Sequence, residues 1–254
     1  MRIEQGWLKE ARQVVSPNHD ERPQGEVSAV VLHSISLPPG EFGGEHIERL
    51  FTNRLNAAAH PYFAGIAQLR VSAHLLIRRD GECVQFVSFD RRAWHAGRSS
   101  WSDRGQVRQA LNDFTVGIEL EGDEIHAYRD EQYRTLVQVI RALMETYPAI
   151  DPTRITSHAR VAPLRKSDPG PAFDWAYFRQ TLRRNGDDAR EKRARRLYSN
   201  GSFITSLGGE SVWPRLFSVT AGVAIQYRRC GKGFHNALIG SKVTLRYRST
   251  PFVA

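Results

Sequence analysis

The chain has 254 residues, 41% hydrophobic and 25% charged, which predicts one large domain, or one domain of roughly 150–200 residues with an appendage, and excludes a wholly disordered protein. The formal net charge of +9 lies at one end, because residues 1–184 carry 24 basic and 23 acidic side chains whereas residues 185–254 carry 12 and 4. Binding to a nucleic acid or an anionic membrane is therefore not expected of residues 1–184 and stays a hypothesis for residues 185–254.

Hydrophobic periodicity predicts strands and helices that alternate along residues 28–184. Apolar runs and alternation predict strands over 28–33, 71–79, 83–88, 115–121 and 154–158, with Asp80-Gly81 as the turn of a hairpin. Apolar side chains at helical spacing predict helices over 45–55, from Asp130 to Pro148 and from Asp174, with both aspartates as N-caps. We expect an α/β fold over residues 1–184, in which a mixed central β-sheet is flanked by helices, followed by a basic C-terminal extension over residues 185–254.

Cysteine usage and the chain's apolar runs bear on its location. The two cysteines, Cys83 and Cys230, form no Cys-x-x-Cys motif and are too few for a disulfide framework, which favours a reducing compartment. The first residues lack the apolar region of a signal peptide, and no apolar run reaches the roughly 18–20 residues of a membrane span. We therefore expect a cytoplasmic protein, with a secreted enzyme that has lost its signal peptide as the alternative.

Two of the nine histidines follow predicted strands, where ligand-binding loops commonly converge. His33 ends the strand over 28–33, and His158 ends the strand over 154–158. Asp168 comes ten residues after His158, in a loop bounded by proline and glycine that can bring the carboxylate back toward the strand end. Two neutral imidazoles and one carboxylate leave a fourth tetrahedral position open for water, which is the pattern of a catalytic zinc site.

Such a site needs a general base and a group that stabilises an oxyanion. Glu119 is the candidate base, because it projects from a strand whose alternate positions are apolar; the alternative is a solvated strand face. Lys166 is the candidate electrophile, because an extended loop points it the same way as Asp168, two residues later. Residues 1–184 contain only one other lysine, Lys9, against 22 arginines, which hints that a compact point charge is needed at position 166.

Blocks of sequence in residues 1–184 closely resemble the AmpD-type N-acetylmuramoyl-L-alanine amidases, a family of zinc enzymes. These blocks are Glu4-Gln-Gly-Trp-Leu8, His33 with Ser-Ile-Ser-Leu-Pro-Pro-Gly-Glu-Phe-Gly-Gly44, Arg70-Val-Ser-Ala-His74, Ile77-Arg-Arg-Asp-Gly-Glu82, Arg92-Ala-Trp-His-Ala-Gly97, Asn112 to Gly122, and His158 to Trp175. They stand in order over more than two thirds of the chain, and the Pro-Pro-Gly-Glu-Phe-Gly-Gly block resembles the intracellular recycling enzymes.

The resemblance implies a role for each candidate residue. His33, His158 and Asp168 match the zinc ligands, Glu119 the acid that activates water, and Lys166 the residue that stabilises the oxyanion. The implied substrate is a 1,6-anhydro-N-acetylmuramyl peptide from cell-wall turnover, cut between the lactyl carbonyl and L-alanine. In relatives this reaction lowers the muropeptide signal that induces β-lactamase.

Substrate contacts are expected from a further group of residues, namely Ser34, Arg70, His74, Trp94 and Arg108. Arginine suits peptide carboxylates and tryptophan can lie against a sugar or a peptide, although Trp94 and His74 can equally serve packing near the hairpin. Ser34 stands where the family usually has asparagine, and the stretch over 99–111 departs from the family pattern, so Arg108 matches a family arginine only approximately.

Two other classes of function remain open. The first is a non-catalytic muropeptide-binding module on the same fold, which needs neither Glu119 nor Lys166. The second is nucleic-acid binding, motivated by the charge of residues 185–254. That segment lies outside the resemblance, and a loosely attached extension without a function of its own is the alternative for it.

Overall fold

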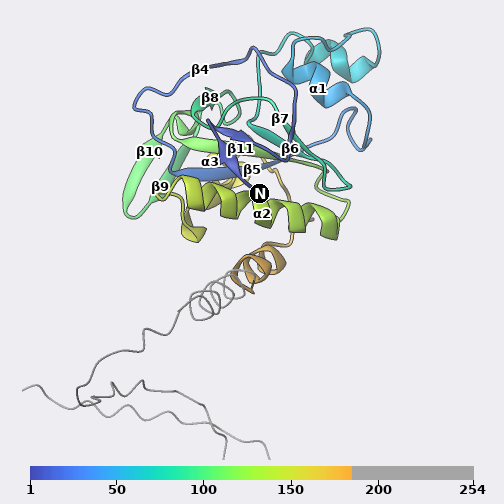
Figure 1. The fold of residues 1–254 in the computed structure, drawn as a ribbon. Helices are drawn as coiled ribbons and strands as arrows, with labels where there is room; N and C mark the ends of the chain where they lie inside the picture. Colours follow the sequence, from blue (N-terminus) through green and yellow to red (C-terminus); the bar gives the residue numbers. More distant parts are fainter. Residues whose placement is uncertain (185–254) are drawn as a thin grey trace, which may run out of the picture. The chain divides into compact units, whose positions relative to one another are not determined.

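The computed structural model describes residues 1–184, and the predicted extension over residues 185–254 lies outside the described residues (Figure 1). A six-stranded sheet of order β12-β5-β11-β6-β7-β3 forms the centre. Its strands are β3 (Arg12–Gln13), β5 (Ala29–Ile35), β6 (Leu75–Ile77), β7 (Cys83–Gln85), β11 (Thr115–Glu121) and β12 (Ile155–Ser157). Neighbouring strands run parallel except for the antiparallel β6–β7 pair, so the predicted mixed sheet is confirmed.

The remaining elements are short and surround this sheet. Three antiparallel pairs join β1 (Ile3–Glu4) to β2 (Trp7–Leu8), β4 (His19–Glu21) to β8 (Arg91–Ala93), and β9 (Ser100–Asp103) to β10 (Gln106–Gln109). The 3-10 turns are η1 (Pro61–Gly65), η2 (Leu111–Asp113) and η3 (Pro152–Arg154). Within residues 1–184, none of the helices is both long enough and apolar enough to span a bilayer.

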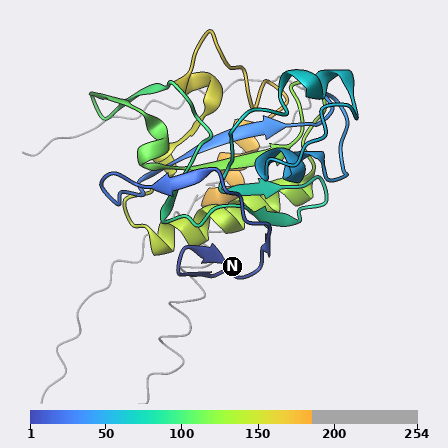
Figure 2. The ribbon, with the colours of Figure 1, turned by 90° about the horizontal axis from the view of Figure 1, so that it is seen from above.

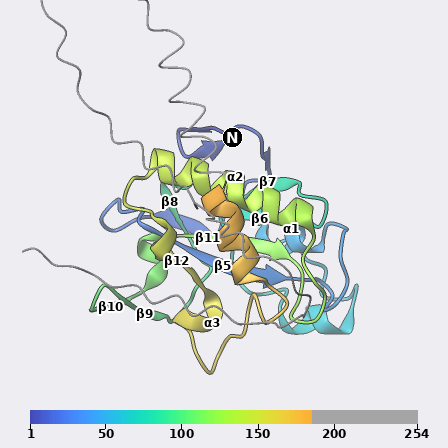
Figure 3. The same cartoon turned by 90° about the horizontal axis from the view of Figure 1, so that it is seen from below.

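Two helices cover one face of the sheet (Figure 3). These are α2 (Asp130–Thr146) and the helix that spans residues 175–184 of the described chain. Val116, Ile118 and Leu120 alternate along β11 and pack with the apolar side of α2, which is why this strand buries its apolar set here. This cluster holds most of the largest apolar side chains and forms the main core.

The starts of these helices differ from each other. The Asp174 carboxylate accepts a hydrogen bond from the Tyr177 amide at 2.9 Å, which confirms Asp174 as an N-cap. Asp130 is instead the first residue of α2, so its predicted role as the cap is wrong. Arg129 precedes it as the N-cap residue, and the Arg129 amide donates to the Gln132 side chain at 3.1 Å, which is the contact that the third helical residue makes in a capping box.

The opposite face of the sheet carries two smaller apolar clusters. Figure 2 looks onto this face, with α2 behind the sheet. One gathers Leu76 and Phe86 under α1 (His46–Phe51), and the other gathers Val31 and Trp101 near β9. The helix predicted over 45–55 is shorter than expected, because Asn53 adopts a left-handed backbone with φ of 59°. The part of this sheet face between the two clusters is polar, and it contains the candidate site.

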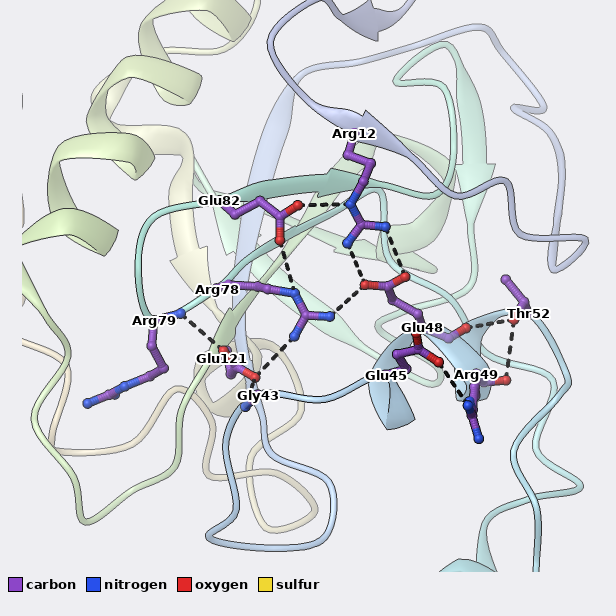
Figure 4. Close-up of polar contacts among 10 residues, drawn as sticks. All are labelled: Arg12, Gly43, Glu45, Glu48, Arg49, Thr52, Arg78, Arg79, Glu82 and Glu121. Atoms are coloured by element: carbon purple, nitrogen blue, oxygen red, sulfur yellow. Dashed lines mark hydrogen bonds and ion pairs between the residues drawn. The ribbon is translucent and has the colours of Figure 1, made fainter.

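A network of charged side chains fastens α1 and the loop before it to the sheet (Figure 4). Arg78 contacts Glu48 at 2.5 Å, and Glu121 and Glu82 at 3.3 Å each, while Glu48 also binds Arg12. The Glu121 carboxylate accepts a further hydrogen bond from the Gly43 amide at 2.6 Å. Because Glu121 ends β11, the network holds the loop before α1 close to the strand that carries Glu119.

Candidate active site

Strand register brings two of the predicted site residues together. His33 on β5 pairs with Glu119 on β11 in the parallel ladder, and both side chains face away from α2. β5 continues to Ile35, so His33 lies inside the strand rather than at its end as predicted. His158 is also displaced from its predicted place, because β12 ends at Ser157 and His158 begins the short helix α3 (His158–Val161).

Three ligand atoms converge at this point of the sheet. His33 Nδ1 lies 3.0 Å from His158 Nδ1 and 3.1 Å from Asp168 Oδ2, and His158 Nδ1 lies 3.0 Å from the same oxygen. Both imidazoles are buried, and the Asp168 backbone is tied to α3 through a hydrogen bond from the Ala159 amide at 2.9 Å. The predicted loop path of Asp168 back toward His158 is thus observed.

The donor set fits a zinc ion. Tetrahedral zinc with bonds of about 2.0–2.1 Å separates its ligand atoms by about 3.3 Å, close to the separations found here. His158 Nε2 lies 3.3 Å from the Ala96 carbonyl, which only accepts hydrogen bonds, so this nitrogen carries a proton, and in the neutral ring Nδ1 keeps its lone pair. A bare imidazole nitrogen directed at a carboxylate is the arrangement that a shared cation stabilises.

The protonation states of these groups suit a metal as well. Burial lowers the pKa of His33 to about 4, although the nearby Asp168 carboxylate opposes this shift. Burial alone would raise the pKa of Asp168, but the close approach of the His158 and His33 imidazoles outweighs it and holds that pKa below its ordinary value. The imidazole of His33 is therefore neutral and the carboxylate of Asp168 is ionised at neutral pH, as metal ligands must be.

Glu119 is buried beside the ligand cluster. Its side chain is 9% exposed, which overturns the alternative of a solvated strand face. Among the described residues Oε2 of Glu119 has no hydrogen-bond partner. Burial, together with the charge of Asp168, raises the pKa of Glu119 well above its ordinary value, so this carboxylate is suited to take up a proton.

A cavity of about 540 Å³ opens over these groups. Glu119 and Lys166 both line it, and so do Ser34 and Trp94 among the predicted substrate-binding residues. The Trp94 indole donates to the Asp20 carboxylate at 3.2 Å, and Asp20 is itself held by Arg92 through two hydrogen bonds. The indole is thereby anchored at the cavity wall rather than free to rotate.

Three predicted substrate-binding residues lie elsewhere. His74 is fully buried: its Nδ1 accepts from the Gly117 amide and its Nε2 lies 3.0 Å from the Arg91 carbonyl, so its role is structural and the prediction of a substrate contact is wrong. Arg108 forms a bidentate pair with Glu26 at 2.7 and 2.8 Å beside a separate cleft. Arg70 is exposed and does not line the cavity, whereas its neighbour Leu69 does.

His95 is the residue of the site that the sequence reasoning missed. It lines the cavity and its Nδ1 lies 3.0 Å from His33 Nε2. One sequence signal could have revealed it, namely Gly117 in the interior of a predicted strand. An isolated glycine in a strand marks a close approach by another group, and a Cβ at this position would lie 2.4 Å from the His95 ring.

Comparisons with known proteins agree with this geometry. The model of the N-acetylmuramoyl-L-alanine amidase family matches residues 23–171. The chain is 59% identical over 180 residues to the 1,6-anhydro-N-acetylmuramyl-L-alanine amidase AmpD of Citrobacter freundii, which covers 70% of this chain and 94% of that protein. It is 58% identical to AmpD of Escherichia coli K12 over 70% of this chain and 96% of that protein.

Solved structures support the same relationship. A crystal structure of a selenomethionine derivative of AmpD is 57% identical and superposes with a TM-score of 0.67, over 72% of this chain and 99% of that chain. A solution structure of Citrobacter freundii AmpD is 58% identical, with a TM-score of 0.52. The fold, the matched residues and these identities lead to one conclusion: the chain belongs to the N-acetylmuramoyl-L-alanine amidase family and is an amide hydrolase.

Proposed function

We propose that this amidase is a zinc enzyme that cleaves 1,6-anhydro-N-acetylmuramyl peptides between the lactyl carbonyl and L-alanine during peptidoglycan recycling. The observation that carries the proposal is the convergence of His33, His158 and Asp168 within about 3 Å of one another beside the buried Glu119. The AmpD relatives at 58–59% identity support the anhydromuramyl substrate.

His33, His158 and Asp168 would hold the zinc ion, which would supply a Lewis acid able to acidify water and to polarise the scissile carbonyl. Glu119 accepts a proton from the attacking water, whose oxygen forms the new bond to the carbonyl carbon. Lys166 places its positive charge on the cavity wall, where it stabilises the developing oxyanion. Glu119 then returns the proton to the leaving nitrogen as the carbon–nitrogen bond breaks, which yields a lactyl carboxylate and a free peptide amine.

Two features of the cavity support a muropeptide as the occupant. Its volume of about 540 Å³ falls in the range of small-molecule sites. Trp94 offers an anchored aromatic surface to a sugar or a peptide, and Ser34, the residue after His33 in the chain, lines the same cavity. We therefore keep Trp94 and Ser34 as proposed substrate contacts.

The proposal extends to the setting of the reaction. A cytoplasmic location is supported by the free, buried thiol of Cys83, and cell fractionation tests it. The β-lactamase response expected of relatives is tested by measuring β-lactamase activity in cells that lack this protein.

Product analysis distinguishes the enzyme from a binding module. Purified full-length protein is incubated with an anhydromuramyl tripeptide, and the mixture is separated by liquid chromatography with mass detection. An enzyme releases free tripeptide and anhydro-N-acetylmuramic acid, whereas a binding module forms a complex and leaves the substrate intact. Release of a different fragment would show that the assigned bond is wrong.

A further inference from the structure

His95 lies against His33 on the side away from the other two ligands. The distance from His33 Nε2 to His95 Nδ1 is 3.0 Å, and the rings meet edge to face at an angle of 86°. One of these two nitrogens must carry the proton of a hydrogen bond. Which of them does so decides whether His33 Nδ1 has a lone pair for a metal, because a neutral imidazole has one bare nitrogen.

The hydrogen bonds of Thr115 determine which nitrogen of each imidazole carries the proton. The Thr115 hydroxyl lies 2.7 Å from the Leu111 carbonyl, which can only accept, so the hydroxyl donates its hydrogen there. The same hydroxyl oxygen lies 3.3 Å from His95 Nε2 and must therefore accept a hydrogen from it. With its proton on Nε2, His95 is left with a bare Nδ1, which accepts from His33 Nε2. His33 Nδ1 is then unprotonated and faces the other two ligand atoms.

The backbone around His95 holds the ring in this place. The Asn112 side-chain oxygen accepts from the amides of His95 and Ala96, at 3.2 and 2.8 Å. Gly117 leaves room for the ring, because a Cβ there would lie 2.4 Å from the ring carbon of His95. The Ala96 carbonyl receives His158 Nε2 at 3.3 Å, so the same clamped segment orders both histidine ligands.

We propose that His95 is a positioning residue that holds His33 in the form whose Nδ1 is unprotonated, and that it thereby raises the affinity of the site for zinc. The inference rests on the proposed function, because that function assigns the metal to His33, His158 and Asp168. His95 acts through His33 and the structure gives it no separate chemical step. The backbone carbonyl of Leu111, 16 residues away in sequence, determines which ring nitrogen of His95 carries the proton.

The test compares His95→Leu with His95→Asn in the full-length protein. Leucine removes the acceptor, whereas the side-chain oxygen of asparagine can take the position of Nδ1 and accept from His33. We expect zinc affinity, measured by competition with a chromophoric chelator, to fall roughly 10- to 100-fold in His95→Leu and to return to within about threefold of wild type in His95→Asn. His126→Leu, which removes an exposed histidine on another loop, is the control and should match wild type.

A second readout reports on the proposal even if a variant does not fold. Long-range proton–nitrogen NMR of the metal-free wild-type protein should show His33 protonated on Nε2, and His95→Leu should shift His33 toward a mixture of both forms. Gly117→Ala, which removes no hydrogen-bonding group, should reproduce part of the loss of zinc affinity by displacing the ring.

The outcomes separate the two proposals. Wild-type protein that binds no zinc would overturn the proposed function. Wild-type protein that binds zinc, but shows His33 protonated on Nδ1 or an unchanged zinc affinity in His95→Leu, would overturn the role of His95 alone.

Discussion

Replacing Arg78 by methionine tests the charged network that fastens α1 to the sheet (Figure 4). The arginine side chain is 11% exposed and pairs with Glu121, which is 2% exposed. Methionine keeps most of the volume but leaves Glu121 without its ion pair. Breaking a buried pair on one side costs about 3–5 kcal/mol. The Gly43 and Arg79 amides still donate to Glu121, and Arg12 still binds Glu48, so we expect the free energy of unfolding to fall by about 2–3 kcal/mol.

Urea unfolding followed by circular dichroism measures this loss, which corresponds to a fall in Tm of roughly 5–10 °C for a domain of this size. Arg134→Met on the exposed side of α2 is the matched control, because its ion pairs are exposed and should contribute less than about 0.5 kcal/mol. The double variant Arg78→Met with Glu121→Gln should recover about 1 kcal/mol, since it removes the charge left unpaired. A loss in Arg78→Met no larger than that in Arg134→Met would refute the reasoning.

The remaining predictions concern the site and its surroundings. Glu119→Gln should retain bound zinc and lower kcat about 10²- to 10⁴-fold, as seen by metal analysis and product assay, because it removes the proton acceptor and leaves all three ligands. Hydrogen bonds from Arg108 hold the pKa of Glu26 at about 2. The stability that this lowered pKa contributes is complete above the ordinary pKa of about 4.5 and is lost as the pH falls toward 2. Glu26→Gln should therefore cost about 1 kcal/mol at pH 7 and progressively less below pH 4.5, in urea unfolding at several pH values. Arg108→Gln should leave KM unchanged, and a severalfold rise in KM would return Arg108 to the substrate site. Removing residues 185–254 should leave amidase activity within about twofold, because a solved AmpD chain is covered to 99% by only 72% of this chain. The same truncation should abolish any salt-dependent shift of DNA.

Much of the site follows from local sequence pattern. Alternation along 115–121 placed Glu119 on the face opposite Val116 and Ile118, and the structure confirms this. The loop that carries Asp168 was expected to return to His158, and it does so. These inferences succeed because strand periodicity and short loops restrict where a side chain can go, whatever the rest of the chain does.

Other parts depend on contacts between distant segments, which local pattern does not contain. His74 and Trp94 have the same two alternatives from sequence, a substrate contact or packing near the hairpin. In the structure, backbone groups of Gly117 and Arg91 hold His74, while Asp20 anchors Trp94 at the cavity. Local pattern did not predict the ion pair of Arg108, because Glu26 lies 82 residues away in sequence. His95 escaped notice for the same reason, since its partner is 62 residues away.

The central claim is that His33, His158 and Asp168 hold the zinc with which Glu119 cleaves the amide. Zinc content and product release, measured together on wild type, Glu119→Gln and His158→Ala, test it most directly. We predict about one zinc per chain with free peptide for wild type, zinc without product for Glu119→Gln, and neither for His158→Ala. Full turnover by zinc-free His158→Ala would contradict the account.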